Sequence, residues 1–197
     1  MKVSKTLDAI AFAAKGHDSV HQYRKYSLDP YIVHPIAVIK ILTEAGEEDE
    51  DVLTAAALHD IFEDVWPKLL LENDERAEIY SPDNITVLFG GKVTGIVTEL
   101  TDVYTPEAYP DLNRAGRKVL EAERLGTISF DSMKVKLADL IDNTKDICDF
   151  DRGFAVKYLK EKEKILDKFR PRIESHGIDI LHKLLKIADT QIHNELT

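Results

Sequence analysis

Residues 55–64 read Ala-Ala-Ala-Leu-His-Asp-Ile-Phe-Glu-Asp, so an apolar helix face leads directly into four ionisable side chains. Residues four apart lie on the same side of a helix, and this spacing pairs His59 with Glu63 and Asp60 with Asp64. Burial of such groups costs free energy unless something compensates their charge. A divalent cation would do so, because imidazole nitrogen and carboxylate oxygen are both good ligands for first-row metals. The stretch therefore predicts a metal site.

Two other segments offer further ligands. His34 lies among apolar residues in the segment 30–36, and Asp139 lies on an apolar helix with Lys136 one turn before it and Asn143 one turn after it. Two His and two Asp from three predicted helices make a mixed nitrogen and oxygen site. Such a site can leave coordination positions open for water and substrate.

Each piece alone has a plainer interpretation. A single His-Asp pair, such as His59 and Asp60, is usually a surface pair or a satisfied core pair. His34 alone is typical of a helix start, and Asp139 alone is compatible with a buried acid paired to Lys136 or Lys134. The combination, in this order and with these apolar flanks, is more specific than any single member.

The hydrophobic spacing is helical nearly throughout the chain. A first amphipathic helix, with Val3 on its apolar face, is expected to end near Gly16, and Ser81-Pro82 is suited to cap a short helix after the less clear residues 67–81. Further helices are predicted over residues 31–45, 49–65, 83–88, 91–101, 111–126, 129–148, 153–170 and 177–194. We therefore expect an all-α helical bundle, organised as a single domain over residues 1–197. The amphipathic helix 177–194 either packs on that core or makes a homodimer contact.

The composition limits which classes of binding partner are expected for this chain. The formal net charge of −10 opposes binding to nucleic-acid backbones, but it does not exclude a small phosphorylated ligand held in one pocket. The single cysteine, Cys148, excludes a disulfide framework and a cysteine-based zinc site, and it fits a reducing compartment. Because there is neither a signal-peptide pattern nor an apolar run of about 20 residues, we expect a cytoplasmic protein without a membrane partner.

The ordered set of His34, His59-Asp60 and Asp139 resembles the signature of the HD superfamily of metal-dependent phosphohydrolases. Several short sequence motifs resemble those in the hydrolase domain of RelA/SpoT enzymes and in the stand-alone small alarmone hydrolases of the metazoan SpoT-homologue type. The resemblance covers roughly residues 7–170. The motifs that carry it are Gln-Tyr-Arg-Lys at 22–25, Pro-Tyr-Ile-Val-His-Pro at 30–35, His-Asp-Ile-Phe-Glu-Asp at 59–64, Leu-Phe-Gly at 88–90, Leu-Thr-Asp at 100–102 and Lys-Leu-Ala-Asp at 136–139.

The resemblance implies an HD-type helical bundle that removes the 3′-pyrophosphate from (p)ppGpp, giving pyrophosphate and GDP or GTP. It implies one divalent ion, usually Mn²⁺, held by His34, His59, Asp60 and Asp139. Glu63 and Asp64 would be the catalytic pair that places and activates water. Asp64 is the better candidate for the water contact and Glu63 for acid–base or supporting duty, although the sequence does not separate these roles.

The resemblance also implies substrate contacts. Arg24 and Lys25 would meet phosphates, although both are also compatible with solvated loop charges. Asn143 would hydrogen-bond the nucleotide, and Tyr158 falls at the place of a pocket tyrosine.

Two segments depart from the family pattern. Residues 66–81 are longer than the matching family segment, and residues 104–110 are unlike it; the basic side chains that follow, at Arg114, Arg117 and Lys118, either reach phosphates or solvate their helix. Two alternatives stay open, and the departures motivate the first of them. One is an HD phosphohydrolase acting on another nucleotide, such as NADPH or a nucleoside mono- or triphosphate. The other is a catalytically idle scaffold that binds a nucleotide or a protein.

Overall fold

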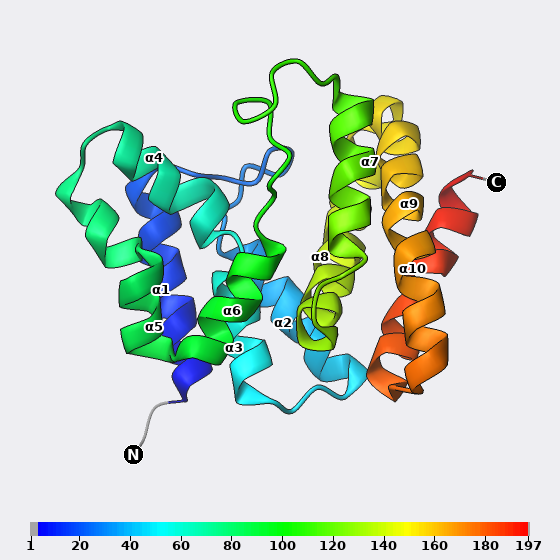
Figure 1. The fold of residues 1–197 in the computed structure, drawn as a ribbon, viewed down its shortest axis with the longest axis horizontal. Helices are drawn as coiled ribbons and strands as arrows, with labels where there is room; N and C mark the ends of the chain where they lie inside the picture. The colour runs from blue at the N-terminus through cyan, green and yellow to red at the C-terminus, as the bar shows by residue number, and fades with distance from the viewer. Residues whose placement is uncertain (1–3, 197) are drawn as a thin grey trace. The chain divides into compact units, whose positions relative to one another are not determined.

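The structure, a computed structural model, describes residues 4–196, so Val3 lies outside the described residues. Within that range the regular secondary structure is helical, and extended backbone pairs only at an isolated bridge between Tyr23 and Pro30. The predicted all-α class is confirmed (Figure 1). The described helices form two compact units, one up to Thr101 and the other from Asp102 onward.

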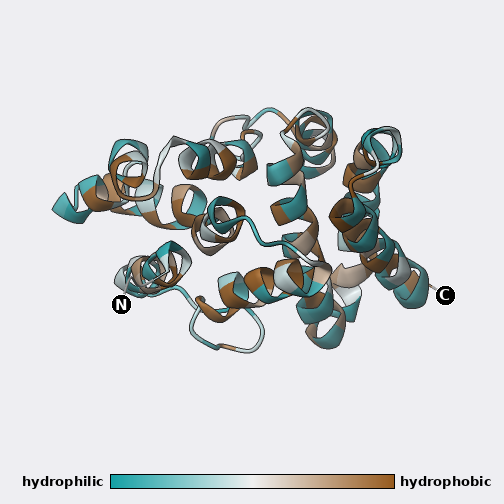
Figure 2. Cartoon of the chain, turned by 90° about the horizontal axis from the view of Figure 1, so that it is seen from below, coloured by the Kyte–Doolittle hydropathy of each residue, from teal (hydrophilic) through white to brown (hydrophobic). Residues whose placement is uncertain are grey.

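The first unit is built around α3, which packs against three other helices, α1, α2 and α6. Residues 55–57 of α3 are alanines without exposed surface, and such small side chains allow neighbouring helices to approach closely. Most of its helices carry brown and teal residues on different faces (Figure 2). In chain order the elements are α1 (Lys5–Ser19), α2 (Val33–Ala45), α3 (Glu50–Leu58), the π-helix η1 (Ile61–Val65), α4 (Trp66–Leu71), the 3₁₀-helix η2 (Glu75–Tyr80), α5 (Pro82–Phe89) and α6 (Gly91–Leu100).

The predicted continuous helix over residues 49–65 is wrong in its second half. α3 ends at Leu58, and the chain then forms the π-helix η1, in which the Trp66 N–H donates to the Ile61 carbonyl, five residues back. Pro67 supplies a physical reason: a proline has no N–H to donate, and its ring clashes with the carbonyl four residues before it. Asp60 and Asp64 remain joined by a four-residue turn, because the Asp64 N–H donates to the Asp60 carbonyl at 2.9 Å. Pro67 lies in the first turn of α4, which begins at Trp66.

The first helix continues beyond its predicted end, because α1 passes through Gly16 and stops at Ser19. A Cβ atom built on Gly16 would lie 2.9 Å from the Tyr80 ring and 3.1 Å from the Ile61 side chain. The absence of a side chain at Gly16 therefore lets α1 lie against η1 and η2.

We expect Gly16→Ala to lower the free energy of unfolding by about 1–3 kcal/mol, because the added methyl group overpacks this contact. Gly95→Ala is the matched control, since Gly95 lies exposed inside α6 with no atom near its missing Cβ. That change should raise the free energy of unfolding by about 0.5–1 kcal/mol. Urea denaturation of both variants measures the difference, and a stabilising Gly16→Ala would contradict this packing.

The second unit consists of α7 to α10, in which α10 packs on α8 and α9, and α9 packs on α7 (Figure 1). The predicted helix over 111–126 begins only at Arg114, because the Asn113 side chain accepts a hydrogen bond from the Gly116 N–H at 2.9 Å and caps it. The helix predicted over 153–170 runs on through Pro171 to His176 and ends at Gly177, which has a φ of 64°. The helices are α7 (Arg114–Leu125), α8 (Phe130–Phe150), α9 (Arg152–His176) and α10 (Asp179–Leu196).

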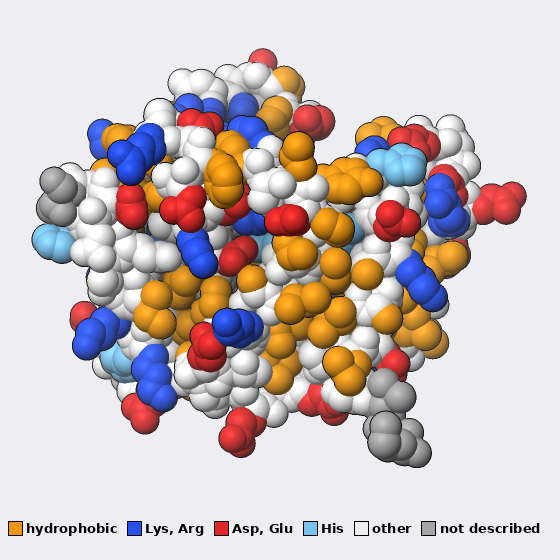
Figure 3. Space-filling model, turned by 180° about the vertical axis from the view of Figure 1, so that it is seen from behind, with side chains coloured by type: hydrophobic (Ala, Val, Ile, Leu, Met, Phe, Trp, Pro, Cys, Tyr) orange, Lys and Arg blue, Asp and Glu red, His pale blue; other side chains and the backbone are white. Residues whose placement is uncertain are grey.

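Charged side chains of both signs surround exposed apolar ones on the face drawn in Figure 3. Among the residues described, no helix has both the length and the apolar character that crossing a membrane requires.

Candidate metal centre

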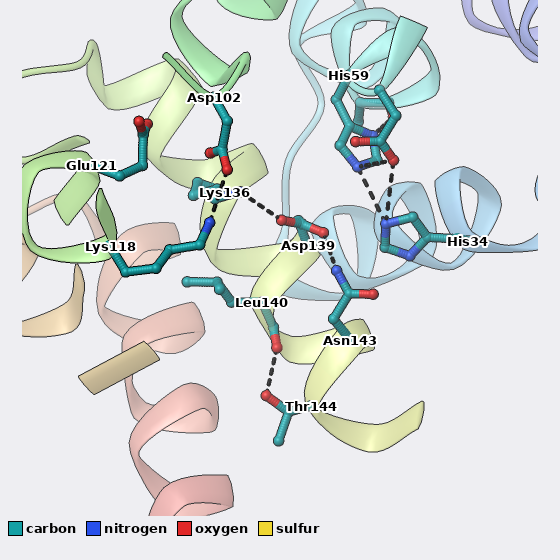
Figure 4. A network of polar contacts seen from close by, with 12 residues as sticks. His34, His59, Asp102, Lys118, Glu121, Lys136, Asp139, Leu140, Asn143 and Thr144 are labelled. Atoms are coloured by element: carbon teal, nitrogen blue, oxygen red, sulfur yellow. Dashed lines mark hydrogen bonds and ion pairs between the residues drawn. The ribbon is translucent and has the colours of Figure 1, made fainter. Parts of the chain in front are cut away.

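Two histidines from different helices meet inside the first unit. His34 is the second residue of α2, His59 follows the last residue of α3, and both are buried. Their Nε2 atoms are 3.2 Å apart (Figure 4). The Nδ1 of His59 lies 2.8 Å from the carbonyl oxygen of Ala56. A carbonyl can only accept, so the His59 proton is on Nδ1 and its Nε2 is left as a lone-pair donor for a metal.

Asp60 completes a group of three. Its Oδ2 lies 3.1 Å from the Nε2 of His59 and 3.7 Å from the Nε2 of His34. The backbone of Asp60, with φ −97° and ψ 0°, lies in the sparsely populated bridge region that many active-site residues occupy. The Tyr31 hydroxyl donates to the same Oδ2 at 2.7 Å and holds the carboxylate in place.

This donor set fits a divalent cation. One potential ligand atom from each of His34, His59 and Asp60 lies within 4.8 Å of the others. With the proton of His59 on Nδ1, two imidazole nitrogens and a carboxylate oxygen converge, so either a proton or a cation has to lie between them. Mixed imidazole and carboxylate ligands suit first-row divalent metals.

The predicted catalytic pair lies on the π-helix η1. Glu63 is exposed and Asp64 is partly buried, so the two acids have different surroundings. The Asp64 Oδ2 accepts a hydrogen bond from the Gln22 side-chain amide at 2.9 Å. Burial, followed by the charge of Asp60, raises the pKa of Asp64 to about 6. A carboxylate placed beside the metal-binding group is suited to accept a proton from water.

The raised pKa predicts how the metal-free protein responds to pH. A folded-state pKa of about 6, against an ordinary value of 3.8, means that protonation of Asp64 stabilises the fold at low pH. That stabilisation is lost as the pH rises through about 6. Asp64→Asn keeps the acceptor oxygen and removes the charge, so the metal-free variant should melt above the metal-free wild type at neutral pH, by roughly 2–4 °C per kcal/mol gained.

Differential scanning calorimetry in chelator, between about pH 5 and pH 8, measures this difference. The exposed Asp111→Asn provides a control for removal of one negative charge. A difference between Asp64→Asn and wild type that did not grow with pH would contradict the assignment.

Three other predicted site residues lie in the second unit. Asp139, on α8, accepts hydrogen bonds from Lys136 at 2.9 Å and from Asn143 at 2.6 Å, and these use both of its oxygens (Figure 4). Lys134 instead pairs with Asp131. Asp139 is thus oriented by its own helix, and its role as fourth ligand stays a prediction.

Tyr158 lies on α9, where burial and then the charge of Asp139 raise the pKa of its hydroxyl, so this group remains protonated. Its contact with a nucleotide stays a prediction, as does that of Asn143.

The predicted phosphate-binding residues have different surroundings. Arg24 is buried, whereas Lys25 is exposed with its ammonium group 4.8 Å from the centre of the Tyr26 ring. Among the later basic residues, Arg114 pairs with Glu161 and Lys118 with Asp102, while the Arg117 guanidinium donates to a backbone carbonyl. Arg114, Arg117 and Lys118 are therefore each paired with or bonded to a neighbouring group of the protein.

Three residues near this centre received no role from the sequence. Tyr31 and Gln22 stand inside the motif words, but only the structure shows that they donate to Asp60 and Asp64. His17 gave no sequence signal, yet it is buried and its Nδ1 lies 2.7 Å from the Gln22 side-chain oxygen. A residue whose partner comes from a distant or irregular segment leaves no periodic signal.

Comparison with known proteins gives this geometry a family. The model of the HD domain matches residues 9–172. The chain belongs to the HD-domain family. The clustering of His34, His59 and Asp60 accordingly coincides with the His…His-Asp part of the HD signature.

Curated relatives place the chain in the RelA/SpoT-like branch of the HD family. A human protein named guanosine-3′,5′-bis(diphosphate) 3′-pyrophosphohydrolase MESH1 is 36% identical over 149 residues, which cover 74% of this chain and 71% of the human protein. The Drosophila melanogaster protein of the same name is 34% identical over 146 residues, covering 73% of this chain and 70% of that protein.

Solved structures agree with the HD fold. One, described as a metazoan orthologue of SpoT that hydrolyses ppGpp, matches with a TM-score of 0.71 at 29% identity and covers 97% of each chain. A protein from Listeria monocytogenes matches with a TM-score of 0.58 at 21% identity, covering 86% of this chain and 99% of that one, which supports the fold alone.

Proposed function

We propose that this chain is a metal-dependent hydrolase that removes the 3′-pyrophosphate from (p)ppGpp and releases GDP or GTP. The observation that carries the proposal is the convergence of His34, His59 and Asp60 beside Asp64, in an HD chain whose relatives are named 3′-pyrophosphohydrolases. A divalent ion bound there would offset phosphate charge and make water more acidic.

The side chains have distinct roles in this proposal. Asp64 accepts a proton from the attacking water as the water oxygen bonds to phosphorus and the bond to the ribose 3′ oxygen breaks; that oxygen takes up a proton and leaves as the 3′-hydroxyl of GDP or GTP. The exposed Glu63, on the same π-helix, serves as the acid–base or supporting group. Tyr31 holds Asp60 through its hydroxyl, and the Ala56 carbonyl holds the His59 ring with Nε2 toward the ion.

The finer assignments extend the same proposal. Asp139 would be the fourth ligand to one ion, for which Mn²⁺ suits the mixed nitrogen and oxygen donors. The four side chains expected to contact the nucleotide are Arg24, Lys25, Asn143 and Tyr158. A net charge of −10 favours a nucleotide-sized partner over nucleic acid, and the single cysteine favours a cytoplasmic location. We also propose a homodimer contact through α10.

Product analysis tests the proposed activity. Purified protein with Mn²⁺ is incubated with ppGpp, pppGpp, NADPH and common nucleoside phosphates, and the products are separated by anion-exchange chromatography. We expect equimolar pyrophosphate and GDP from ppGpp, and no such products from His59→Ala.

The other outcomes are informative. Phosphate release from another nucleotide alone would keep the metal centre and overturn the proposed substrate. Failure to hydrolyse any of these nucleotides, by a folded protein that binds Mn²⁺, would favour a nucleotide-binding scaffold.

A further inference from the structure

A chain of hydrogen bonds connects His17 to Asp64. The Nδ1 of His17 lies 2.7 Å from the side-chain oxygen of Gln22, and the side-chain nitrogen of Gln22 donates to the Asp64 Oδ2 at 2.9 Å. An amide has one accepting end and one donating end. Because the carboxylate takes the donating end, the accepting end faces His17, which therefore donates from Nδ1–H.

The opposite orientation of Gln22 would place its amide oxygen against the carboxylate of Asp64. Two acceptors without a proton between them repel each other. The N–H of His17 therefore reinforces the amide orientation that the carboxylate of Asp64 requires. Burial lowers the pKa of His17, which agrees with a neutral ring carrying one proton.

The turn that carries Gln22 is held from two sides. The backbone N–H of Gln22 donates to the His17 carbonyl at 2.9 Å, and the ammonium group of Lys68, in α4, donates to the Val20 carbonyl at 2.6 Å. Between them His21 adopts a φ of 52°, in the left-handed region that few non-glycine residues occupy. Gln22 is therefore part of a constrained turn, and part of the long segment 66–81 supports it.

The ring of His17 also lies close to Tyr31, whose hydroxyl donates to Asp60. The centres of the two rings are 4.5 Å apart. The Nε2 of His17 is buried and has no hydrogen-bond partner among the described residues. Burial of a nitrogen without a partner is unfavourable, so packing alone does not account for a histidine at this position.

We propose that His17 is a positioning residue, which acts through Gln22 to hold the Asp64 carboxylate in its working orientation. This inference rests on the proposed function, because it requires Asp64 to act on the attacking water. His17 and Gln22 do not touch substrate in this proposal. Their effect is expected on the chemical step, and not on substrate or metal affinity.

A double-mutant cycle tests the inference. His17→Phe keeps an aromatic ring against Tyr31 and removes the N–H, and Gln22→Met keeps the length of the side chain and removes the amide. Each change is expected to lower kcat for ppGpp by about 10–100-fold, as supporting groups of metal sites do, with less than about a twofold change in KM or Mn²⁺ affinity. The double variant should be no slower than the slower single variant, because both changes break one chain.

Controls keep the outcome interpretable. His182→Phe changes an exposed histidine of α10 in the same way and should leave kcat unchanged. If His17→Phe does not fold, Gln22→Met alone still has to show the loss of kcat at constant KM. Additive losses, unchanged kcat or lost Mn²⁺ affinity with an active wild type would overturn this inference alone. An inactive wild type would overturn the proposed function and this inference together.

Discussion

Replacement of His59 by alanine should lower the affinity for Mn²⁺ by more than about 100-fold, because a metal ligand matters more than the supporting groups whose loss costs 10–100-fold. The variant removes one of the two imidazoles whose Nε2 atoms lie 3.2 Å apart. Without the ion, several kcal/mol of charge stabilisation are lost, and kcat/KM should fall by at least about 10³-fold. Isothermal titration with Mn²⁺ and steady-state kinetics measure the two quantities.

The fold itself should survive this change. His59 is buried, so the variant leaves a cavity, but the residue caps the C-terminal end of α3 and does not lie within the helix. Circular dichroism should therefore show nearly unchanged helical content, and His59→Gln provides a second variant with a smaller cavity. His182→Ala, at an exposed position, is the matched control. Undiminished turnover by a folded His59→Ala would refute the metal centre.

Asp64→Asn should still bind the metal ion but have a much lower kcat. The asparagine oxygen can still accept from Gln22, but an amide cannot take a proton from water. Loss of a positioned general base typically lowers kcat by about 10²–10⁴-fold. Single-turnover kinetics at saturating Mn²⁺ should show this loss with little change in the affinity for the ion.

Glu63→Gln is the informative comparison, because the neighbouring acid is exposed. A smaller loss of kcat is expected from it. A larger loss would exchange the roles of the two carboxylates. Loss of Mn²⁺ from Asp64→Asn would instead make Asp64 a ligand, and the division between ligands and catalytic groups would be wrong.

The sequence predicted the helical class and brought forward the three residues that cluster. His34, His59 and Asp60 stand in apolar helix patterns, where a buried charge requires a partner, and this requirement made them recognisable. The order of the motif words then supplied the family. Local chemistry and spacing were sufficient for these conclusions.

The geometry around Asp64 could not be predicted in the same way. Periodicity assumes a regular helix, so it did not predict the π-helical turn beside Pro67, although the Asp64 N–H still donates to the Asp60 carbonyl, four residues back. The contacts of Tyr31 and Gln22 depend on an irregular segment between two helices, where no period applies. The role of Asp139 requires the placement of a separate unit, and it remains a prediction.

The wide turn at Ile61–Val65 also determines how the chain tolerates changes of length. A hydrogen bond that spans five residues encloses one residue more than an ordinary α turn, so loss of one residue here can be absorbed by closing a regular turn. Each residue advances an α-helix by about 100°, so a deletion before Glu63 would rotate the two acids away from His59. A shortened relative would thus keep its helices and lose its chemistry. The extra residue in this turn is therefore required by the site and not by the fold.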